Sequence, residues 1–407
     1  MCNIFNLKNL IYITLFFTPL YLIRFKISFI PVNILDILII LVVFLWIIKN
    51  RSSLVLKIKS FFQKNKIFCL IVFLIIAGTA TSAFLNENLS HELGILKSWF
   101  ILPVFLGLII FDEIKKIDEI KKILNIIFYS SAIISIISLF YLLFGNLTYD
   151  LRLRAFYLSP NHLAMMLAYG LLIGAWKILN KKTNNLMEFA LLLSMLVVLF
   201  FTHSYAAWLA LLVSASLLTY FSIHKNQKII FTFILATVFV AFFTYENNSA
   251  KFEDLLNLEK RSSLSSRLII WQSSEKILSD HWIWGIGPGN FQQKYLEYQK
   301  YFSPYLEWAV PQPHNLFLAF WLQTGLMGTT GFLFLITYFI YKIKILTKHK
   351  DSDKRNLSLI LLILLIYTLI HGLFDTLYWK NDLALIFWIN IFLGVRLTDK
   401  KLQNYPE

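Results

Sequence analysis

The chain has 407 residues, of which 58% are hydrophobic and only 15% are charged, and it contains 38 phenylalanines. A water-soluble domain could not expose so much apolar surface, so the composition excludes a soluble protein and predicts an integral membrane protein. The net charge of +15 could suggest nucleic-acid binding, but the basic residues are spread over many short segments between apolar runs and form no single groove, which argues against it. Two cysteines are too few for a disulfide framework.

Long apolar runs recur along the chain, and a helix needs roughly 20 residues of this kind to cross a bilayer. We expect about twelve spanning helices from these runs. Their expected bounds are residues 9–23, 27–48, 67–85, 95–111, 123–145, 161–179, 186–204, 205–223, 229–245, 314–341, 357–373 and 382–396. The pattern therefore predicts an all-α, polytopic integral membrane protein.

The spacing of these runs divides the chain into four regions. One long polar stretch interrupts them, and we expect it to form a large extracytoplasmic loop that contains short amphipathic helices. The regions are N-terminal transmembrane helices at 1–145, transmembrane helices at 146–245 with an outer loop at 146–160, the large loop at 246–313, and C-terminal transmembrane helices with a cytoplasmic tail at 314–407.

The distribution of lysine and arginine predicts the orientation of the chain. Most of the 38 basic residues fall in alternate short segments that include both ends, and few fall in the loops between them. Since basic loops stay on the cytoplasmic side, both termini are expected in the cytoplasm and the 246–313 loop outside it. The first apolar run lacks a small-residue cleavage site and another span follows it, so we expect no cleavable signal.

Two arginines stand out in the expected outer loop 146–160, because the other short outer loops contain few basic residues. Arg152 and Arg154 precede the sequence Ser159-Pro160-Asn161, where the next helix is expected to begin. A guanidinium presents a planar fork of donors that suits phosphate oxygens. The alternative is that both arginines only anchor the loop to lipid headgroups.

The large loop carries a further arginine. Leu264, Leu268, Trp271 and Leu278 share one face of an expected amphipathic helix at the outer surface. Arg267 is next to Leu268 and can lean over that face toward the membrane, where it would hold an anionic headgroup. The alternative is an ordinary surface charge.

The stretch Pro311-Gln-Pro313-His314-Asn315 precedes a long apolar run. The prolines force an extended backbone, so the helix can begin only after them. His314 is therefore expected where a polar loop becomes a membrane helix, and imidazole groups exchange protons near neutral pH. The alternative is that His314 only caps the helix at the interface.

The last expected outer loop contains His371, Asp375 and Lys380 close to membrane depth. Ionisable groups in such places tend to be functional or paired.

Two short motifs have a simpler interpretation. Asp351-Ser-Asp353 resembles the paired aspartates that hold a metal-bound nucleotide sugar, but no nucleotide-binding domain surrounds it, so we interpret it as loop charge. Gly285-Ile-Gly-Pro-Gly289 resembles a phosphate-binding loop, but no strand precedes it and its proline lacks a donor. We interpret it as a turn.

Several of these segments, in this order, resemble the bacterial O-antigen ligase and O-antigen polymerase superfamily over roughly residues 150–395. The most specific is His314-Asn315, followed after nine residues by Gly325-x-x-Gly328, which is similar to the ligase signature in the helix after the large outer loop. The other segments are Arg154 to Asn161, Ser266 to Trp271 leading to Gly285 to Phe291, and His371 to Asp375.

The resemblance implies an inverting glycosyl transfer without a metal or a cofactor. The donor would be a glycan on an undecaprenyl diphosphate carrier at the outer face of the cytoplasmic membrane, and the acceptor a sugar hydroxyl, in ligases on the lipid A core. Arg154 and Arg267 would bind the diphosphate, and His314 would act as the general base or orient the leaving group. Residues in supporting positions would be Arg152, Asn161, Asn315, His371, Asp375 and Lys380.

Other functions stay open at this point. An O-antigen or polysaccharide polymerase and a protein O-oligosaccharyltransferase share the same features. A secondary transporter or lipid flippase would also suit the expected helices, but only Asp36 and Lys97 are ionisable groups deep in the expected spans. A purely structural membrane protein would leave the polar segments unexplained.

Overall fold

The computed structural model describes residues 6–27, 30–86, 89–180, 186–222, 263–302, 310–399 and 402, with isolated positions at 237, 240 and 244. Within these residues the regular secondary structure is helical except for one antiparallel ribbon of two strands, β1 (Arg24–Ile27) and β2 (Ile30–Asn33). Apart from this ribbon, the expected all-α class is confirmed.

The helices follow the apolar runs of the sequence. Those of the first half are α1 (Leu7–Phe16), the short 3-10 helix η1 (Thr18–Leu22), α2 (Ile34–Lys49), α3 (Leu54–Lys64), α4 (Lys66–Phe84), α5 (Leu89–Ile95), the π-helical segment η2 (Leu96–Ile101), α6 (Leu102–Glu113) and α7 (Ile117–Leu143). Those of the second half are α8 (Pro160–Asn180), α9 (Leu186–Phe201), α10 (Tyr205–Ser222), α13 (Ser263–His281), α14 (Phe291–Tyr298), η3 (Gln299–Tyr301), α15 (Leu316–Leu346), α16 (Ser352–Gly372) and α17 (Asn381–Leu397).

Seven helices in the described part are long and apolar enough to cross a membrane. They are α4, the continuous α5 to α6 segment, α7, α8, α10, α15 and α16, and α1 and α9 are shorter apolar helices. A polytopic membrane protein is thereby supported, whereas the count of about twelve stays a prediction. Apart from the isolated positions 237, 240 and 244, the expected span at 229–245 lies outside the described residues, as do residues 246–262 and 303–309 of the expected large loop.

The prediction for the first two spans is wrong between residues 17 and 33. This segment forms η1 and the β1–β2 ribbon, in which Arg24 pairs with Asn33. Pro19 lacks an amide hydrogen and would clash with the helical carbonyl of Leu15, so α1 stops at Phe16. At ten residues, α1 is only about 15 Å long, about half of a bilayer's apolar thickness.

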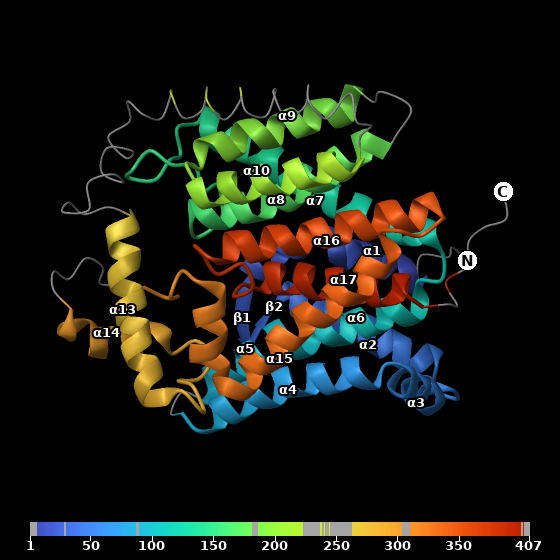
Figure 1. Cartoon of the computed structure of the whole chain (residues 1–407), viewed down its shortest axis with the longest axis horizontal. Helices are drawn as coiled ribbons and strands as arrows, with labels where there is room; N and C mark the ends of the chain where they lie inside the picture. Colours follow the sequence, from blue (N-terminus) through green and yellow to red (C-terminus); the bar gives the residue numbers. More distant parts are fainter. Residues whose placement is uncertain are drawn as a thin grey trace.

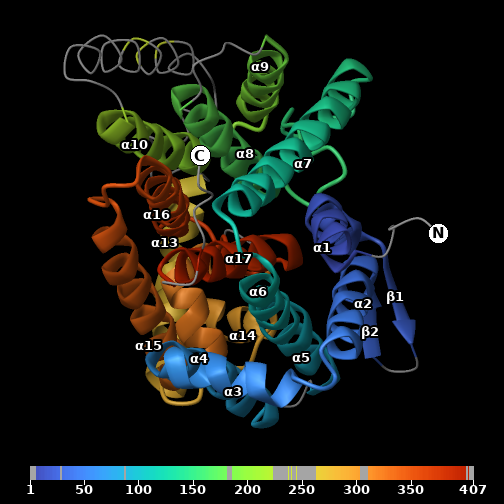
Figure 2. The same cartoon turned by 90° about the vertical axis from the view of Figure 1, so that its right-hand side faces the viewer.

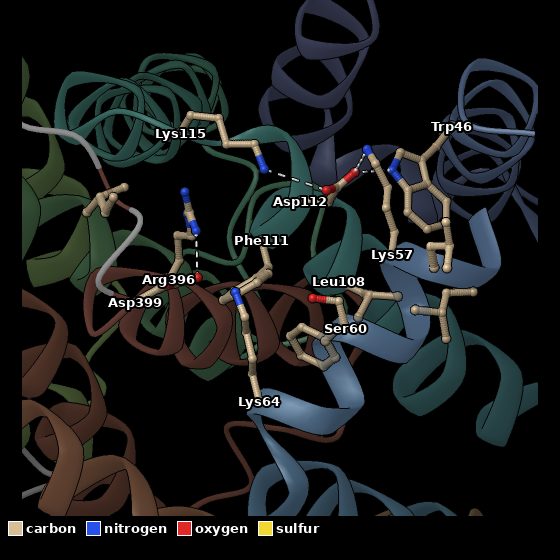
Figure 3. A pocket seen from close by; sticks show the side chains of 14 residues that line it. Trp46, Lys57, Ser60, Lys64, Leu108, Phe111, Asp112, Lys115, Arg396 and Asp399 are labelled. Carbon is tan, nitrogen blue, oxygen red and sulfur yellow. Dashed lines mark hydrogen bonds and ion pairs between the residues drawn. The ribbon is translucent and has the colours of Figure 1, made fainter. Parts of the chain in front are cut away.

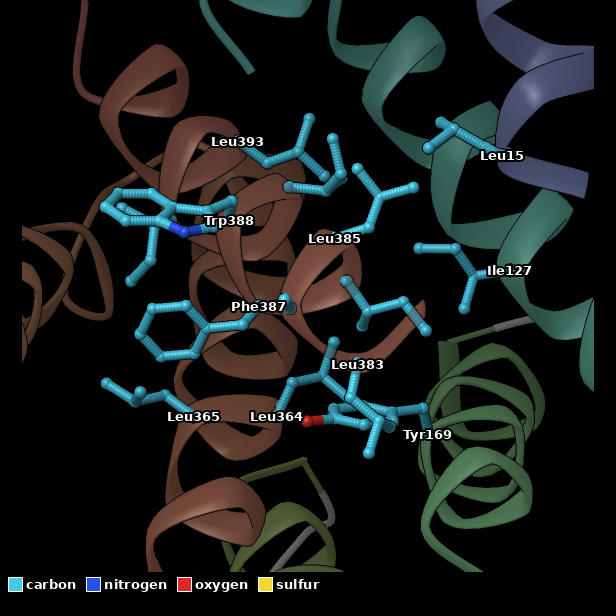
Figure 4. Packing of buried hydrophobic residues seen from close by; sticks show 14 of the residues in the cluster. Leu15, Ile127, Tyr169, Leu364, Leu365, Leu383, Leu385, Phe387, Trp388 and Leu393 are labelled. Carbon is cyan, nitrogen blue, oxygen red and sulfur yellow. The ribbon is translucent and has the colours of Figure 1, made fainter. Parts of the chain in front are cut away.

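Helix α17 lies at the centre of the molecule, with α1, α6, α7, α15 and α16 around it (Figure 2). Every residue from Asn381 to Leu397 is buried. Its side chains pack among those of α1, α7, α8 and α16 (Figure 4). A helix that is apolar all round must be covered on every side, which explains this central position.

Helices α13 and α14 lie together at one end of the bundle, and α3 lies at the other (Figure 1). The apolar core that α13 shares with α14 includes Ile270, Ile277 and Phe291. The expected apolar face of α13 is only partly correct, because Leu268 is 42% exposed while Ile270 is buried.

Two glycines of α15 allow close contacts with other segments. Gly325 has a left-handed backbone (φ +65°) that interrupts the helix, and the segment from Ile283 to Gly289 docks into the interruption. Leu326 N donates to Ile283 O at 2.9 Å, and Ile286 N donates to Leu322 O at 2.6 Å. A Cβ atom on Gly78 of α4 would lie 2.3 Å from the amide nitrogen of Gly328, so α4 needs glycine where it crosses α15. The glycine-rich segment is thus a docked turn.

The two ionisable groups expected deep in the spans are paired. Lys97 Nζ lies 2.9 Å from Asp36 Oδ2, which also accepts a hydrogen bond from Ser98 Oγ at 2.7 Å. Lys97 Nζ also donates to Pro31 O at 2.6 Å. This arrangement joins α2 to η2 and gives both charges structural partners.

Candidate active site

His314 lies directly before helix α15 in a strained backbone conformation. Its φ of +49° is left-handed, which is unusual for a residue with a side chain. Asn315 is the N-cap: its Oδ1 accepts hydrogen bonds from Phe317 N and Leu318 N, both at 3.0 Å. Asn315 Nδ2 also donates to Leu373 O at 3.1 Å, which ties this helix start to the α16–α17 loop. Capping therefore falls to Asn315 and leaves the imidazole of His314 available for another role.

The imidazole of His314 pairs with Asp375 in the α16–α17 loop. His314 Nδ1 lies 3.1 Å from Asp375 Oδ1, which also accepts from Thr376 N at 2.8 Å. Burial alone would raise the pKa of the Asp375 carboxyl, but the charge and hydrogen bond of His314, with Arg267, hold that pKa far below its ordinary value. Because an ionised carboxylate only accepts hydrogen bonds, Nδ1 is the donor in this pair, and in the neutral form of the ring the free lone pair is on Nε2. This is the tautomer that a general base needs.

The second oxygen of Asp375 extends the network to the 146–160 loop. Asn161 Nδ2 donates to Asp375 Oδ2 at 2.9 Å, and Arg152 Nη2 donates to Asn161 Oδ1 at 2.6 Å. Arg152 Nε donates to Thr202 O at 2.8 Å, so the guanidinium also joins the loop to the α9–α10 corner. Residues from three distant parts of the sequence thereby orient one carboxylate.

The two arginines of this loop differ in environment. The side chain of Arg152 is 16% exposed, and two of its nitrogens donate to protein oxygens. Arg154 is exposed, and its side chain forms no hydrogen bond or ion pair with the residues that the structure describes. The expectation that Arg154 is the functional arginine stays a prediction, while Arg152 is the one that belongs to the Asp375 network.

Arg267 of α13 lies on the same side of the protein as His314. Trp271 Nε1 donates to Pro313 O at 3.0 Å, so α13 is fixed against the segment that precedes His314. Burial lowers the pKa of the Arg267 guanidinium, and the nearby charge of Asp375 raises it. An arginine remains protonated under such conditions, so Arg267 places a permanent positive charge beside the dyad of His314 and Asp375.

The remaining expected residues also surround Asp375. His371 is fully buried, with Nδ1 at 2.7 Å from Tyr367 Oη. Burial lowers the pKa of Lys380, whereas Asp375 and Asp382 raise it. The structure thus gathers His314, Asp375, Asn161 and Arg152 by direct contacts, and Arg267, His371 and Lys380 through electrostatic proximity.

A second buried pair lies next to this network, and the sequence analysis did not identify it. His162 Nε2 lies 3.0 Å from Asp382 Oδ1, and both side chains are at most 1% exposed. The ring of Tyr157 packs against His162 at 4.4 Å, and Tyr21 Oη lies 3.4 Å from its nitrogens. His162 directly follows Asn161 in the chain, but its partner is 220 positions away.

The paired aspartates 351 and 353 have structural roles. Asp351 caps α16 by accepting from Asp353 N and Lys354 N, and Asp353 Oδ2 accepts from Lys121 Nζ at 2.6 Å. In the described part of the chain, no group of three or more His, Cys, Asp or Glu side chains could hold a metal ion. Both carboxylates thus have structural partners, but Asp353 lies in the first turn of α16 and not in a loop as expected.

Comparison with known families gives one match. Residues 190–333 match the family model described as O-antigen ligase. The matched segment contains Arg267, the 283–289 turn, His314, Gly325 and Gly328, whereas Asp375 and Arg152 lie outside it. A comparison with curated proteins finds no match. The family match confirms the resemblance inferred from the sequence motifs, and it supports the membership of this chain in the O-antigen ligase superfamily.

Proposed function

We propose that this protein is a ligase-type glycosyltransferase. It moves a glycan from an undecaprenyl diphosphate carrier to an acceptor hydroxyl, on the lipid A core or another surface glycan, at the outer face of the cytoplasmic membrane. The observation that carries the proposal is the pairing of His314 Nδ1 with the ionised Asp375, at the start of a helix within the O-antigen ligase match.

The dyad suits the activation of a hydroxyl. His314 Nε2 accepts the proton of the acceptor hydroxyl while its oxygen attacks the anomeric carbon. The bond from that carbon to the diphosphate oxygen breaks, and the electron pair leaves with the diphosphate, which inverts the anomeric centre. Asp375 stabilises the imidazolium that forms and keeps the ring in place, and a base in this position contributes a factor of roughly 100 to 10,000.

The departing diphosphate needs fixed positive charge. Arg267 supplies such a charge from a partly buried position, where it stabilises developing negative charge more strongly than it would in water. Arg154 is the second candidate, because its exposed guanidinium keeps all of its donors for phosphate oxygens. Arg152 instead positions Asn161 and, through it, Asp375.

The distribution of charge supports an active site that faces outward. The end of the bundle opposite His314 carries lysine ion pairs such as Lys49–Glu113, Lys57–Asp112 and Lys121–Asp353. Basic segments remain on the cytoplasmic side of a membrane, so we propose that both termini lie there and that His314 faces the other side.

The test is transfer by the purified protein in liposomes that contain a diphosphate-linked glycan and a candidate acceptor. His314→Asn removes the base while asparagine tolerates the left-handed backbone. His203→Asn is the matched control, because His203 has a similar backbone (φ +45°) and lies in the α9–α10 corner, outside the dyad of His314 and Asp375.

We expect His314→Asn to lower the rate by about two to four orders of magnitude and His203→Asn to retain most of it. Unchanged transfer by folded His314→Asn protein would overturn the proposal. Transfer only to a second carrier-linked glycan would identify a polymerase instead of a ligase.

A further inference from the structure

A cavity of about 730 Å³ lies at the end of the bundle opposite His314 (Figure 3). Its walls are the C-terminal ends of α2, α6 and α17, together with α3, Lys115, Asp399 and Leu402. Helix α17 connects the two ends of the molecule: Lys380 precedes it near Asp375, and Arg396 near its other end lines the cavity. The length of α17, about 25 Å, separates this cavity from the His314 site.

The lining of the cavity has an excess of positive charge. Its charged residues are four basic side chains and two acidic ones, namely Lys57, Lys64, Lys115, Arg396, Asp112 and Asp399. Asp112 accepts from Lys57 at 2.7 Å and lies 3.6 Å from Lys115, so two lysines share one carboxylate. Burial lowers the pKa of Lys115, and the charges of Arg396 and Lys57 lower it further. Asp112 acts in the opposite direction and raises it. The cavity can therefore accept additional negative charge.

Arg396 carries a donor that the described residues leave unsatisfied. The side chain is 2% exposed; its Nε donates to Ile114 O at 2.6 Å and its Nη1 to Asp399 Oδ2 at 2.9 Å. Its Nη2 is buried and has no hydrogen-bond partner among the described residues. A buried, unsatisfied donor of a charged group is costly, and an anionic oxygen would remove that cost.

Lys64 is the second available cation. It is exposed and forms no hydrogen bond or ion pair with the residues that the structure describes. Figure 3 shows its side chain extending from α3 toward Phe111 and Arg396. Two cations from different helices thus approach the same part of the cavity.

The mouth of the cavity is apolar as well as basic. Helix α3 exposes Val55, Leu56 and Phe62 at 76%, 69% and 53%. A short helix that combines exposed apolar side chains with lysines lies in the interface of a membrane. Leu56 lines the cavity itself, and so does Trp46, a residue type enriched at lipid headgroups. An occupant must therefore combine an anionic group with an apolar part.

We propose that this cavity binds an anionic membrane lipid, with its phosphate group at Lys64, Lys115 and Arg396 and its acyl chains along α3. Basic pockets between membrane helices on the cytoplasmic side suit such headgroups. A soluble phosphate would use the same cations but would gain nothing from Leu56 and Trp46, which is why the proposal commits to a lipid.

The test measures lipid binding to the purified full-length protein in detergent. Native mass spectrometry and the rise in Tm are recorded with phosphatidylglycerol, with phosphatidylcholine and with inorganic phosphate. Lys64→Gln removes a lining cation, and Lys59→Gln is the matched control, because Lys59 is an exposed residue of α3 that does not line the cavity. Equal Tm values without added lipid show that the variants are folded.

We expect phosphatidylglycerol to bind wild-type protein more tightly than phosphatidylcholine, and Lys64→Gln to weaken it roughly fivefold, the effect of one lysine charge at a lipid surface. Lys59→Gln should leave the affinity for phosphatidylglycerol unchanged. The double variant that combines Lys64→Gln with Lys115→Gln should bind this lipid more weakly than Lys64→Gln alone. Equal losses for Lys64→Gln and Lys59→Gln, or equal binding of both lipids, would overturn the site. Stabilisation by inorganic phosphate as large as that by phosphatidylglycerol would overturn its assignment to a lipid.

Discussion

The side-chain amide of Asn161 donates a hydrogen bond to Asp375 at 2.9 Å, although the two residues are 214 positions apart in the chain. The bond joins the start of α8 to the α16–α17 loop. Because Asp375 pairs with His314 through its other oxygen, and Asn161 accepts from Arg152, one carboxylate sets the relative positions of all three side chains. The orientation of the candidate base therefore depends on residues that do not themselves react.

Replacing Asp375 by asparagine should lower transfer by about three to four orders of magnitude. An asparagine amide can donate to Nδ1 of His314, which would move the ring proton to Nε2 and remove the lone pair that accepts the proton of the hydroxyl. The measurement is the rate of glycan transfer in liposomes at saturating donor.

Asp351→Asn is the control for the Asp375 change. Asp351 caps α16 with its side-chain oxygen, and asparagine caps a helix about as well as aspartate does. This variant should therefore keep its Tm and its transfer rate. Full activity of a folded Asp375→Asn protein would show that the tautomer of His314 is irrelevant to the reaction.

The low pKa of Asp375 predicts how stability depends on pH. Burial opposes ionisation, but His314 and Arg267 more than compensate, so the pKa in the folded protein is below the ordinary value of 3.8. A carboxyl whose pKa falls on folding stabilises the folded state above its unfolded pKa, and this contribution disappears as the pH falls toward the folded pKa. We expect the Tm difference between wild type and Asp375→Asn to persist down to about pH 5 and to narrow only below about pH 4. A difference that vanishes between pH 7 and pH 5 would contradict the depressed pKa.

Arg152 and Arg154 should respond differently to substitution by lysine. Lysine at 152 cannot donate to Thr202 O and Asn161 Oδ1 with the geometry of a guanidinium fork, so Asp375 would lose its orientation. We expect kcat to fall about tenfold or more while KM for the donor changes little. Lysine at 154 should instead raise KM for the donor, because it would bind the diphosphate more weakly than the guanidinium of arginine does.

Steady-state kinetics with varied donor concentration separates these two effects. A rise of KM alone for Arg152→Lys would make Arg152 a substrate-binding residue. Unchanged kinetics for Arg154→Lys and Arg154→Ala would remove Arg154 from the proposed site.

The helices were largely predictable, because a long apolar run in a membrane can form the hydrogen bonds of its backbone amides and carbonyls in few ways other than a helix. Helices α8, α9, α10, α16 and α17 begin and end within a few residues of the expected bounds. The error at residues 17–33 arose because hydropathy alone does not weigh prolines: Pro19 and Pro31 interrupt two apolar runs that otherwise resemble spans.

The candidate site was predictable as a set of residues but not as a network. His314, Arg267 and Asp375 were each identified from chemistry and position, since ionisable groups close to membrane depth tend to be functional or paired. Their pairing depends on how the helices pack, which one sequence does not reveal. His162 was not identified for the same reason. It is a polar residue within an apolar run, and its partner Asp382 lies in another helix.

The interruption of α15 at Gly325 should be essential for stability. Its backbone (φ +65°, ψ −173°) lies in a region that glycine alone adopts readily and that costs roughly 1–3 kcal/mol for other residues, and a Cβ atom there would lie 2.4 Å from the carbonyl oxygen of Ile283. The docked turn cannot move away easily, because its own amides are bonded to α15. Gly325→Ala should therefore lower the Tm markedly and disturb the segment between α13 and His314.

Gly145→Ala separates the effect of backbone strain from that of the contact. Gly145 also has a positive φ (+68° against +65°), but a Cβ atom there would meet nothing within 4 Å. Its substitution should cost only the conformational strain, whereas Gly325→Ala should cost about 1–3 kcal/mol more, because a close-packed contact is forced apart. Thermal unfolding of both variants measures the difference. Equal Tm values would mean that the 283–289 turn can move away from α15, and transfer by Gly325→Ala protein would then be expected to remain close to that of wild type.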